Sequence, residues 1–336
     1  MRYRTLSAGL SRAPRLARSL RRSLRRSLGR SMALAMAMGI GLPPGLYAGS
    51  AHGSEMLSVA DIHTHYKWSQ EGVTTPAQAI GALREQNVDF AVVIGTPPEY
   101  ALYLEREAPD LIVPIYGPYN GVRNWFRWTR DPELVADARA ALESGDYHGI
   151  GELHLIGGFA PRRDSAQVME ALMKLGAEFQ KPLLIHTEFS RPKPLLDLCT
   201  RHPRTPVLWA HAGAILKPGY VRQVLEACPM VSAEFAARDP WRYVNNPIAD
   251  EDTGRLLPEW EQLVMDFPER FLVGSDPVWP VEQLDGWDRD DTGWQELGRF
   301  LGFHRRWLSF LPEREREMIA RTNARRLFGL PPKEGN

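Results

Sequence analysis

Eight short apolar segments alternate with amphipathic segments along most of this chain of 336 residues. The apolar segments have the length and composition of fully buried parallel strands. The segments between them place apolar residues three and four positions apart, as at Val168, Leu172 and Leu175, which predicts helices with one buried face. The expected strands are residues 57–66, 90–97, 111–119, 147–157, 182–189, 206–213, 230–240 and 271–279.

Eight strand–helix units in one chain predict a (β/α)8 TIM barrel, a fold of about 250 residues. A doubly wound open sheet is the alternative, and it predicts a glycine-rich phosphate-binding turn after the first strand. The sequence HTHYKWSQEG (residues 63–72) holds no such turn. We therefore predict a single TIM-barrel domain, residues 52–336, with long loops after the third, seventh and eighth strands.

The first 51 residues differ in composition from the rest. They hold ten arginines and no acidic residue, followed by the apolar run SMALAMAMGIGL and by small residues around Ala48 and Ser50. This order is typical of a secretory signal peptide, so we predict bacterial-type export to the periplasm. The basic region is long for a signal peptide, which suggests a start at Met32 or a twin-arginine route through Arg25 and Arg26. A disordered basic tail, a wrongly assigned start and an uncleaved anchor are the alternatives. The apolar run is too short for a comfortable membrane span, so we expect none in the mature protein.

The remainder of the chain is acidic. Without the leader it has 31 basic and 41 acidic residues, a net charge of −10. A nucleic-acid partner is therefore not expected.

The chain has two cysteines, Cys199 and Cys228, each late in a predicted helix. An oxidising compartment would permit a disulfide, but two cysteines are weak grounds for one, and two unpaired thiols are favoured.

Chemically distinctive side chains stand where the predicted strands end. In a TIM barrel the carboxyl ends of the strands carry the active site. Alternate strand residues point the same way, so His63 and His65 are predicted to face the barrel axis together. Imidazoles and carboxylates gathered in an apolar barrel need compensation, which a divalent metal supplies. Zinc suits such donors, with manganese or iron as alternatives. The residues are His63, His65, Glu152, His154, His186, His211 and Asp276.

This ordered pattern resembles the amidohydrolase superfamily. The segments DIHTH, IGELHL, LLIHTE, LWAHAG and FLVGSD resemble its successive blocks, and NARRLFGL resembles the end of the amidohydrolase-related and TatD-like metal-dependent TIM-barrel hydrolases. The resemblance spans about residues 57–330. It implies a metal-dependent hydrolase that uses activated water on a small molecule.

The resemblance also implies roles for individual residues. His63, His65 and Asp276 would hold the more buried metal ion, and His186 and His211 a second. Glu152 would bridge both ions, and Asp276 would also accept a proton from the attacking water. In relatives with one ion, the histidine at the position of His211 acts on the substrate instead, and the glutamate at the position of Glu152 need not bind metal. Asp61 is expected to orient a ligand or neighbouring backbone.

Further residues are candidates for substrate binding. Trp68 and Trp279 follow strands, where the rim of the site forms, and aromatic side chains there suit an organic substrate. Arg238, after the seventh strand, is the preferred anchor for an anion. Glu188 and His154 would contact substrate, although His154 could equally support a metal ligand. Self-association remains open, and His304 is expected to be an ordinary surface histidine.

The sequence as a whole predicts an exported, metal-dependent hydrolase of an ester, lactone, amide or related bond. Four alternatives remain. They are a decarboxylase or lyase with one metal ion, a metal-free lactonase, a TatD-like nuclease, and a secreted binding protein without catalysis. The acidic body disfavours the nuclease, and the complete set of expected metal residues disfavours the binding protein.

Overall fold

The computed structural model describes residues 56–155, 163–187, 191–242, 244, 246–278 and 292–332. These residues all fall in one compact unit, residues 53–336. The predicted leader, residues 1–51, lies outside the described residues. No helix in the described ranges is both long enough and apolar enough to cross a membrane.

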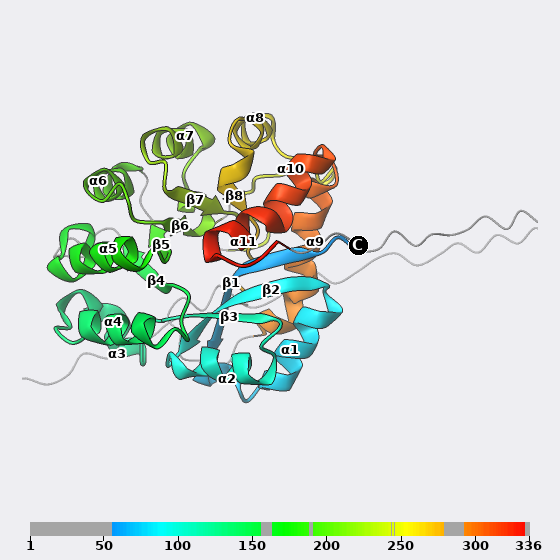
Figure 1. Ribbon diagram of the computed structural model, residues 1–336. Coiled ribbons are helices and arrows are strands. Elements are labelled where there is room, and N and C mark those ends of the chain that lie inside the picture. The colour runs from blue at the N-terminus through cyan, green and yellow to red at the C-terminus, as the bar shows by residue number, and fades with distance from the viewer. Residues whose placement is uncertain are drawn as a thin grey trace, which may run out of the picture. The chain divides into compact units, whose positions relative to one another are not determined.

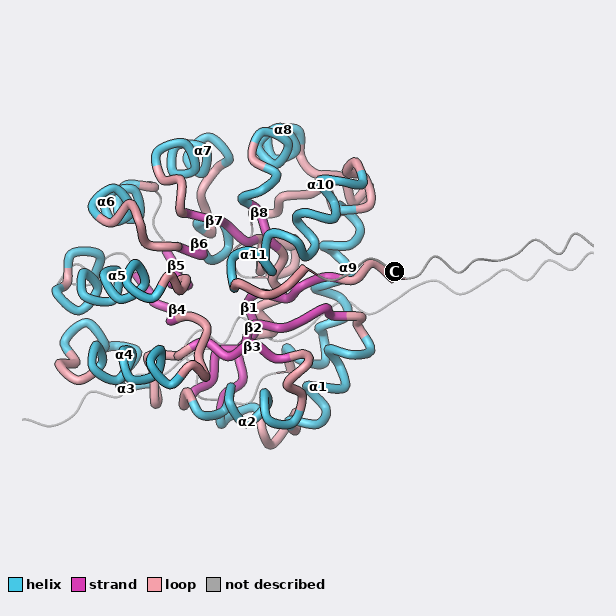
Figure 2. The backbone as a smooth tube through the Cα atoms, viewed as in Figure 1, coloured by secondary structure: helices cyan, strands magenta, loops and turns pink. Residues whose placement is uncertain are grey.

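Eight parallel strands form the centre of this unit, within the described residues. They run in chain order in two ladders, β1 to β3 and β4 to β8. Figures 1 and 2 show the strands in the middle with helices around them. The strands are β1 (Val59–Lys67), β2 (Val88–Thr96), β3 (Ile112–Ile115), β4 (Ile150–Leu155), β5 (Leu183–Thr187), β6 (Val207–Trp209), β7 (Val231–Glu234) and β8 (Phe271–Leu272).

Backbone hydrogen bonds join the two ladders at both seams. Between β3 and β4, Tyr116 N–H donates to Gly149 O at 2.9 Å, and Gly151 N–H donates to Tyr116 O at 2.9 Å. Between β1 and the segment after β8, Ile62 N–H donates to Val273 O at 3.1 Å. The strands therefore form a (β/α)8 barrel, as the sequence predicts.

Helices cover the outside of the strands. The long connections after β3, β7 and β8 fall where the sequence predicts them, with α3 inside the first. The helices are α1 (Pro76–Glu85), α2 (Glu99–Glu107), α3 (Val122–Arg127), α4 (Leu134–Ser144), α5 (Gln167–Phe179), α6 (Lys193–Arg201), α7 (Pro218–Ala227), α8 (Pro258–Asp266), α9 (Leu297–Leu308), α10 (Glu313–Glu317) and α11 (Asn323–Phe328).

The apolar core has two layers. The larger layer lies between strands and helices, and a smaller one fills the barrel itself. Phe328 and Ala324 of α11 pack with Ala60 and Phe90, which stand near the starts of β1 and β2. In Figure 1, α11 lies across this end of the strands. The amino-terminal end of the barrel is therefore closed by apolar packing, and the carboxyl-terminal end is left for polar groups.

An irregularity in β1 decides which way its histidines point. Pairing with β2 shifts register between Asp61 and Thr64. Ile62, within the shifted stretch, packs inside the barrel, and Tyr66, after it, packs outside. A one-residue slip moves the following side chains to the opposite face of a strand. His63 and His65 therefore both enter the barrel, directly after an inward isoleucine.

Two expectations are wrong. Cys199 and Cys228 form a disulfide, with their Cα atoms 5.9 Å apart, rather than two unpaired thiols. The physical reason is that α6 and α7 are neighbours, so cysteines at the ends of both helices lie side by side. His304 is not at the surface but buried on α9, where it bonds to Gly274 O and receives the Trp307 indole N–H.

Candidate metal centre

Six predicted metal ligands come together at the carboxyl ends of the strands. His63 and His65 come from β1, Glu152 from β4 and His186 from β5, while His211 and Asp276 lie in the segments after β6 and β8. Together with His154, their ligand atoms form overlapping groups of three, and within each group all the atoms lie within 4.8 Å of one another. Five of the six are buried, and His65 is partly exposed. The structure thus gathers residues that are up to 213 positions apart in the sequence.

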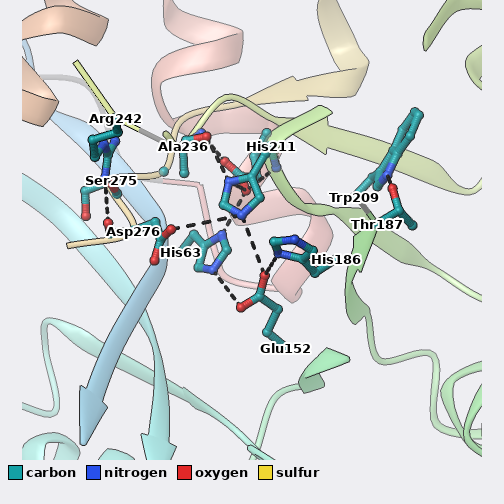
Figure 3. A network of polar contacts seen from close by, with 12 residues as sticks. His63, Glu152, His186, Thr187, Trp209, His211, Ala236, Arg242, Ser275 and Asp276 are labelled. Atoms are coloured by element: carbon teal, nitrogen blue, oxygen red, sulfur yellow. Dashed lines mark hydrogen bonds and ion pairs between the residues drawn. The ribbon is translucent and has the colours of Figure 1, made fainter. Parts of the chain in front are cut away.

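Glu152 stands at the centre of this group. Its Oε2 lies 3.5 Å from His63 Nε2 and 3.2 Å from His65 Nε2. Its Oε1 lies 2.6 Å from His186 Nδ1 and 3.7 Å from His211 Nε2. Figure 3 shows one oxygen directed to His63 and the other to His186 and His211. One carboxylate therefore faces two pairs of imidazoles.

Asp276 closes the group on the opposite side. Its carboxylate lies 3.8 Å from His65 Nε2 and 4.0 Å from His211 Nε2. Its backbone N–H donates to His63 O at 2.7 Å, and Arg242 Nη1 donates to its carbonyl at 2.6 Å. Asp276 and His211 have φ angles of 44° and 56°, in the left-handed region that side chains other than glycine seldom adopt. Surrounding hydrogen bonds hold this unusual backbone in place.

A further buried carboxylate, Glu234 at the end of β7, was missed by the sequence analysis. Its Oε1 accepts from His211 N–H at 2.7 Å and lies 2.8 Å from His63 Nδ1. Gly274 leaves room for it, because a Cβ there would come within 2.9 Å of Glu234 Oε2. The strand-end rule used for the other strands, applied to the seventh, would have identified it.

Second nitrogens and nearby backbone fix the orientation of the ligands. His63 directs Nδ1 to Glu234 and Nε2 to the centre, while His211 places Nδ1 2.9 Å from Ala236 O. Such partners fix the tautomer and ring orientation of metal-binding histidines. Asp61 behaves as expected of a residue that orients backbone, since its Oδ1 accepts from Ser275 N–H at 2.8 Å. Burial raises the pKa of Asp61 to about 6.

The electrostatics of the centre favour ionised carboxylates. Burial opposes the charge of Glu152, but His154, His63 and His186 together hold its pKa well below the usual range. Burial likewise opposes the charge of Asp276, and His63, His211 and His65 lower its pKa. Burial disfavours a charge on His63, yet Glu152 and Asp276 raise its pKa well above the usual value. The carboxylates are therefore the anionic groups of the cluster, and a metal ion bound to His63 would take the place of the proton that they stabilise on that ring.

The predicted substrate-binding residues lie less close to one another than the predicted metal ligands do. His154 lies 3.4 Å from Glu152, through its Nε2 and Oε2. Trp68 is half-buried at the end of β1. Arg238 is fully buried, with its guanidinium 4.6 Å from the centre of the Trp260 ring and bonded to Leu216 O, and these contacts do not include the metal cluster. Glu188 and Trp279 lie outside the described residues.

The donor set fits a divalent metal. It combines imidazole nitrogens with carboxylate oxygens, the ligands of zinc and related ions in catalytic sites. Isolated buried carboxylates and imidazoles at these distances are costly without a compensating charge. The partners on Nδ1 of His63 and His211 leave Nε2 of each ring directed at the carboxylates, which is the orientation that ligation needs.

Comparisons with known proteins agree with this fold. A family model described as amidohydrolase matches residues 111–330. An amidohydrolase from Burkholderia multivorans with bound zinc has a similar structure, with a TM-score of 0.53 and 18% identity, covering 81% of this chain and 100% of that chain. A probable 2-pyrone-4,6-dicarboxylic acid hydrolase from Acinetobacter baumannii, with citric acid bound, has a TM-score of 0.53 and 14% identity, covering 82% and 100%.

A TatD homologue from Escherichia coli is also similar in structure. Its TM-score is 0.54 at 14% identity, covering 81% of this chain and 98% of that chain. None of the curated proteins compared with the chain matches it. At these identities the solved structures show a shared TIM-barrel fold.

Proposed function

The chain belongs to the amidohydrolase family, and on that premise we propose that it is a metal-dependent hydrolase acting on an ester, lactone, amide or related bond of a small organic molecule. The position of Glu152 between two pairs of histidines carries this proposal. A carboxylate with each oxygen directed to a separate pair is suited to bridging two cations. His63, His65 and Asp276 would hold one ion, and His186 and His211 the other.

Bound cations would supply Lewis acidity, lowering the pKa of water and polarising the scissile carbonyl. The protein's own groups do the remaining work. Asp276, kept ionised by its histidine neighbours, accepts the proton that the attacking water loses. His211 lies between the carboxylates of Glu152 and Asp276, within reach of substrate that enters from the strand ends.

The side chains near His154 support the proposal of an organic substrate. The Trp125 ring meets the His154 ring edge-on at 5.5 Å, and the Arg163 guanidinium lies 5.2 Å from the centre of the Trp125 ring. An aromatic face beside a guanidinium suits a substrate with an apolar body and a negative group. The Acinetobacter baumannii relative has citric acid bound, which supports a substrate with carboxylate groups.

Export to the periplasm forms part of the proposal. The leader has the three-part order of a signal peptide. The Cys199–Cys228 disulfide independently supports an oxidising compartment, where such bonds persist. Intact-mass measurement of protein recovered from a bacterial periplasm tests this. A mass that still includes the leader would contradict it.

Metal content tests the proposed chemistry. Elemental analysis of protein purified without chelators should give close to two ions per chain, and the loaded protein should hydrolyse members of a panel of esters, lactones and amides. A value close to one, with release of carbon dioxide from carboxylated aromatics, would replace hydrolysis by decarboxylation. A chain that takes up no ion even when zinc is supplied would refute the proposal.

A further inference from the structure

His154 lies beside the metal cluster but is not one of the six proposed metal ligands. It follows Glu152 by two residues on β4, so both side chains point to the same face of the strand. Its Nε2 is 3.4 Å from Glu152 Oε2. Its ring stacks on that of His186, with centroids 4.8 Å apart and planes inclined by 29°. His154 therefore contacts two of the proposed metal ligands directly.

Tyr119 holds this histidine in a fixed orientation. The Tyr119 hydroxyl oxygen lies 3.1 Å from His154 Nδ1 and also accepts the backbone N–H of His154 at 3.1 Å. Tyr119 is buried. Its hydroxyl beside Nδ1 directs Nε2 of His154 toward Glu152. This is the arrangement by which a second partner orients a metal-binding imidazole.

The ligand atoms of Glu152, His154 and His186 all lie within 4.8 Å of one another. This group shares only Glu152 with the group formed by His63, His65 and Glu152. Glu152 thus lies beside imidazoles from β1, β4 and β5: Oε2 contacts His63, His65 and His154, and Oε1 contacts His186. A contact made only with substrate would not require His154 to stack on His186 and approach Glu152 at the same time.

We propose that His154 is a ligand of the second divalent cation, together with His186 and Glu152. This inference rests on the proposed function and extends it, because it adds a ligand to the centre. Three imidazoles, counting His211, and a shared carboxylate make the second position rich in nitrogen. Such a position selects zinc, or cobalt in its place, over magnesium or calcium.

Metal titration of the full protein tests the assignment. Protein freed of metal with a chelator is titrated with Zn²⁺ against a chromogenic competitor, and with Co²⁺ while its visible absorption is recorded. His154→Gln should keep the first ion and lose affinity for the second by about 100-fold or more, and the Co²⁺ bands of the second ion should shift. Tyr119→Phe should weaken the second ion less, by about 10-fold, the lower end for loss of an orienting partner.

His148→Gln is the matched control, because it removes a half-buried histidine that precedes the same strand and lies outside the metal groups. It should bind both ions as the wild type does. Circular dichroism and the unfolding temperature of the metal-free variants show whether each has folded.

The outcomes separate the inference from the proposed function. If His154→Gln binds two ions with wild-type affinity and an unchanged Co²⁺ spectrum, His154 is not a ligand, whereas the two-metal hydrolase stands. A rise in KM alone in that variant would make His154 a substrate contact. If the wild type itself binds one ion or none, the two-metal proposal fails, and this inference fails with it.

Discussion

His63 Nδ1 and Glu234 Oε1 lie 2.8 Å apart, and both side chains are fully buried. The same oxygen of Glu234 accepts the backbone N–H of His211. Burial opposes the charge of Glu234, but these contacts lower its pKa, so it remains an anion. One carboxylate from β7, a strand without a proposed metal ligand, thus orients ligands from β1 and from the turn after β6.

Replacing Glu234 should weaken metal binding. We expect Glu234→Ala to reduce metal affinity by about 10- to 100-fold, the usual effect of removing a partner that orients a ligand. Glu234→Gln keeps one acceptor oxygen, so its metal affinity should fall less than that of Glu234→Ala. Competition titration with a chelator measures both. Glu259→Gln, at an exposed carboxylate on α8, is the control. Wild-type affinity in Glu234→Ala would contradict this role.

Asp276 should be essential for turnover and dispensable for folding. Asp276→Asn removes the proton acceptor but keeps the shape of the side chain, and a positioned base typically contributes 10²- to 10⁴-fold. We expect kcat to fall within about that range on whichever substrate the screen identifies. The unfolding temperature should change little. Full activity in the variant would rule out Asp276 as the base.

Arg242 fixes the backbone at Asp276. Its Nη1 donates to Ser275 O and Asp276 O, and its guanidinium pairs with the buried carboxylate of Asp239 at 2.6 Å. Figure 3 shows Arg242 beside Ser275. Arg242→Gln leaves Asp239 buried and unpaired, which typically costs about 3–5 kcal/mol. Denaturant unfolding should show this loss.

A double variant separates the two roles of Arg242. Adding Asp239→Asn to Arg242→Gln should restore part of the stability, because the uncompensated charge is gone. Arg242→Gln should also lower kcat, because the carbonyls of Ser275 and Asp276 lose their donor, and the double variant should not restore it. Recovery of both quantities together would show that Arg242 acts on stability alone.

The disulfide should stabilise the outer layer. It closes a loop with a sequence separation of 29 between α6 and the end of α7. Constraining a loop of that length in the unfolded chain typically contributes about 2–4 kcal/mol. Cys199→Ser combined with Cys228→Ser should lower stability by about that amount and leave metal content unchanged. Equal stability of the variant and the oxidised wild type would contradict the prediction.

His304 makes the fold sensitive to mild acid. Burial lowers its pKa from 6.5 to about 4. Above pH 6.5 the residue is neutral in both states. Between pH 6.5 and about 4 the unfolded chain binds a proton that the native protein excludes, so native stability falls as the pH falls. The loss attributable to this residue is about 3 kcal/mol.

The unfolding free energy at pH 7 and at pH 4.5 measures this effect. The unfolding free energy of His304→Gln should depend less steeply on pH than that of the wild type, because glutamine does not titrate. The other histidines are common to both proteins, so their contribution cancels in the comparison. Identical pH dependence in the two proteins would show that another group is responsible.

The residues at the ends of the predicted strands allowed only part of the site to be predicted. Six residues with metal-binding chemistry were visible because strand order and period fix where such residues gather. The orientation of each histidine ring could not be predicted, because it depends on partners from other segments of the chain. Ala236 O is the partner of His211, and Tyr119 is the partner of His154. Arg238 shows the limit of the rule, since it follows a strand yet packs against Trp260.

By itself, the sequence determined the barrel and the set of strand-end ligands, because buried parallel strands and amphipathic helices impose local periods that a single chain displays. The tertiary structure alone decided contacts between distant segments. It paired Cys199 with Cys228, buried His304, and brought Glu234 onto His63 across 171 residues. These contacts depend on the spacing of neighbouring elements around the barrel, which no local pattern encodes.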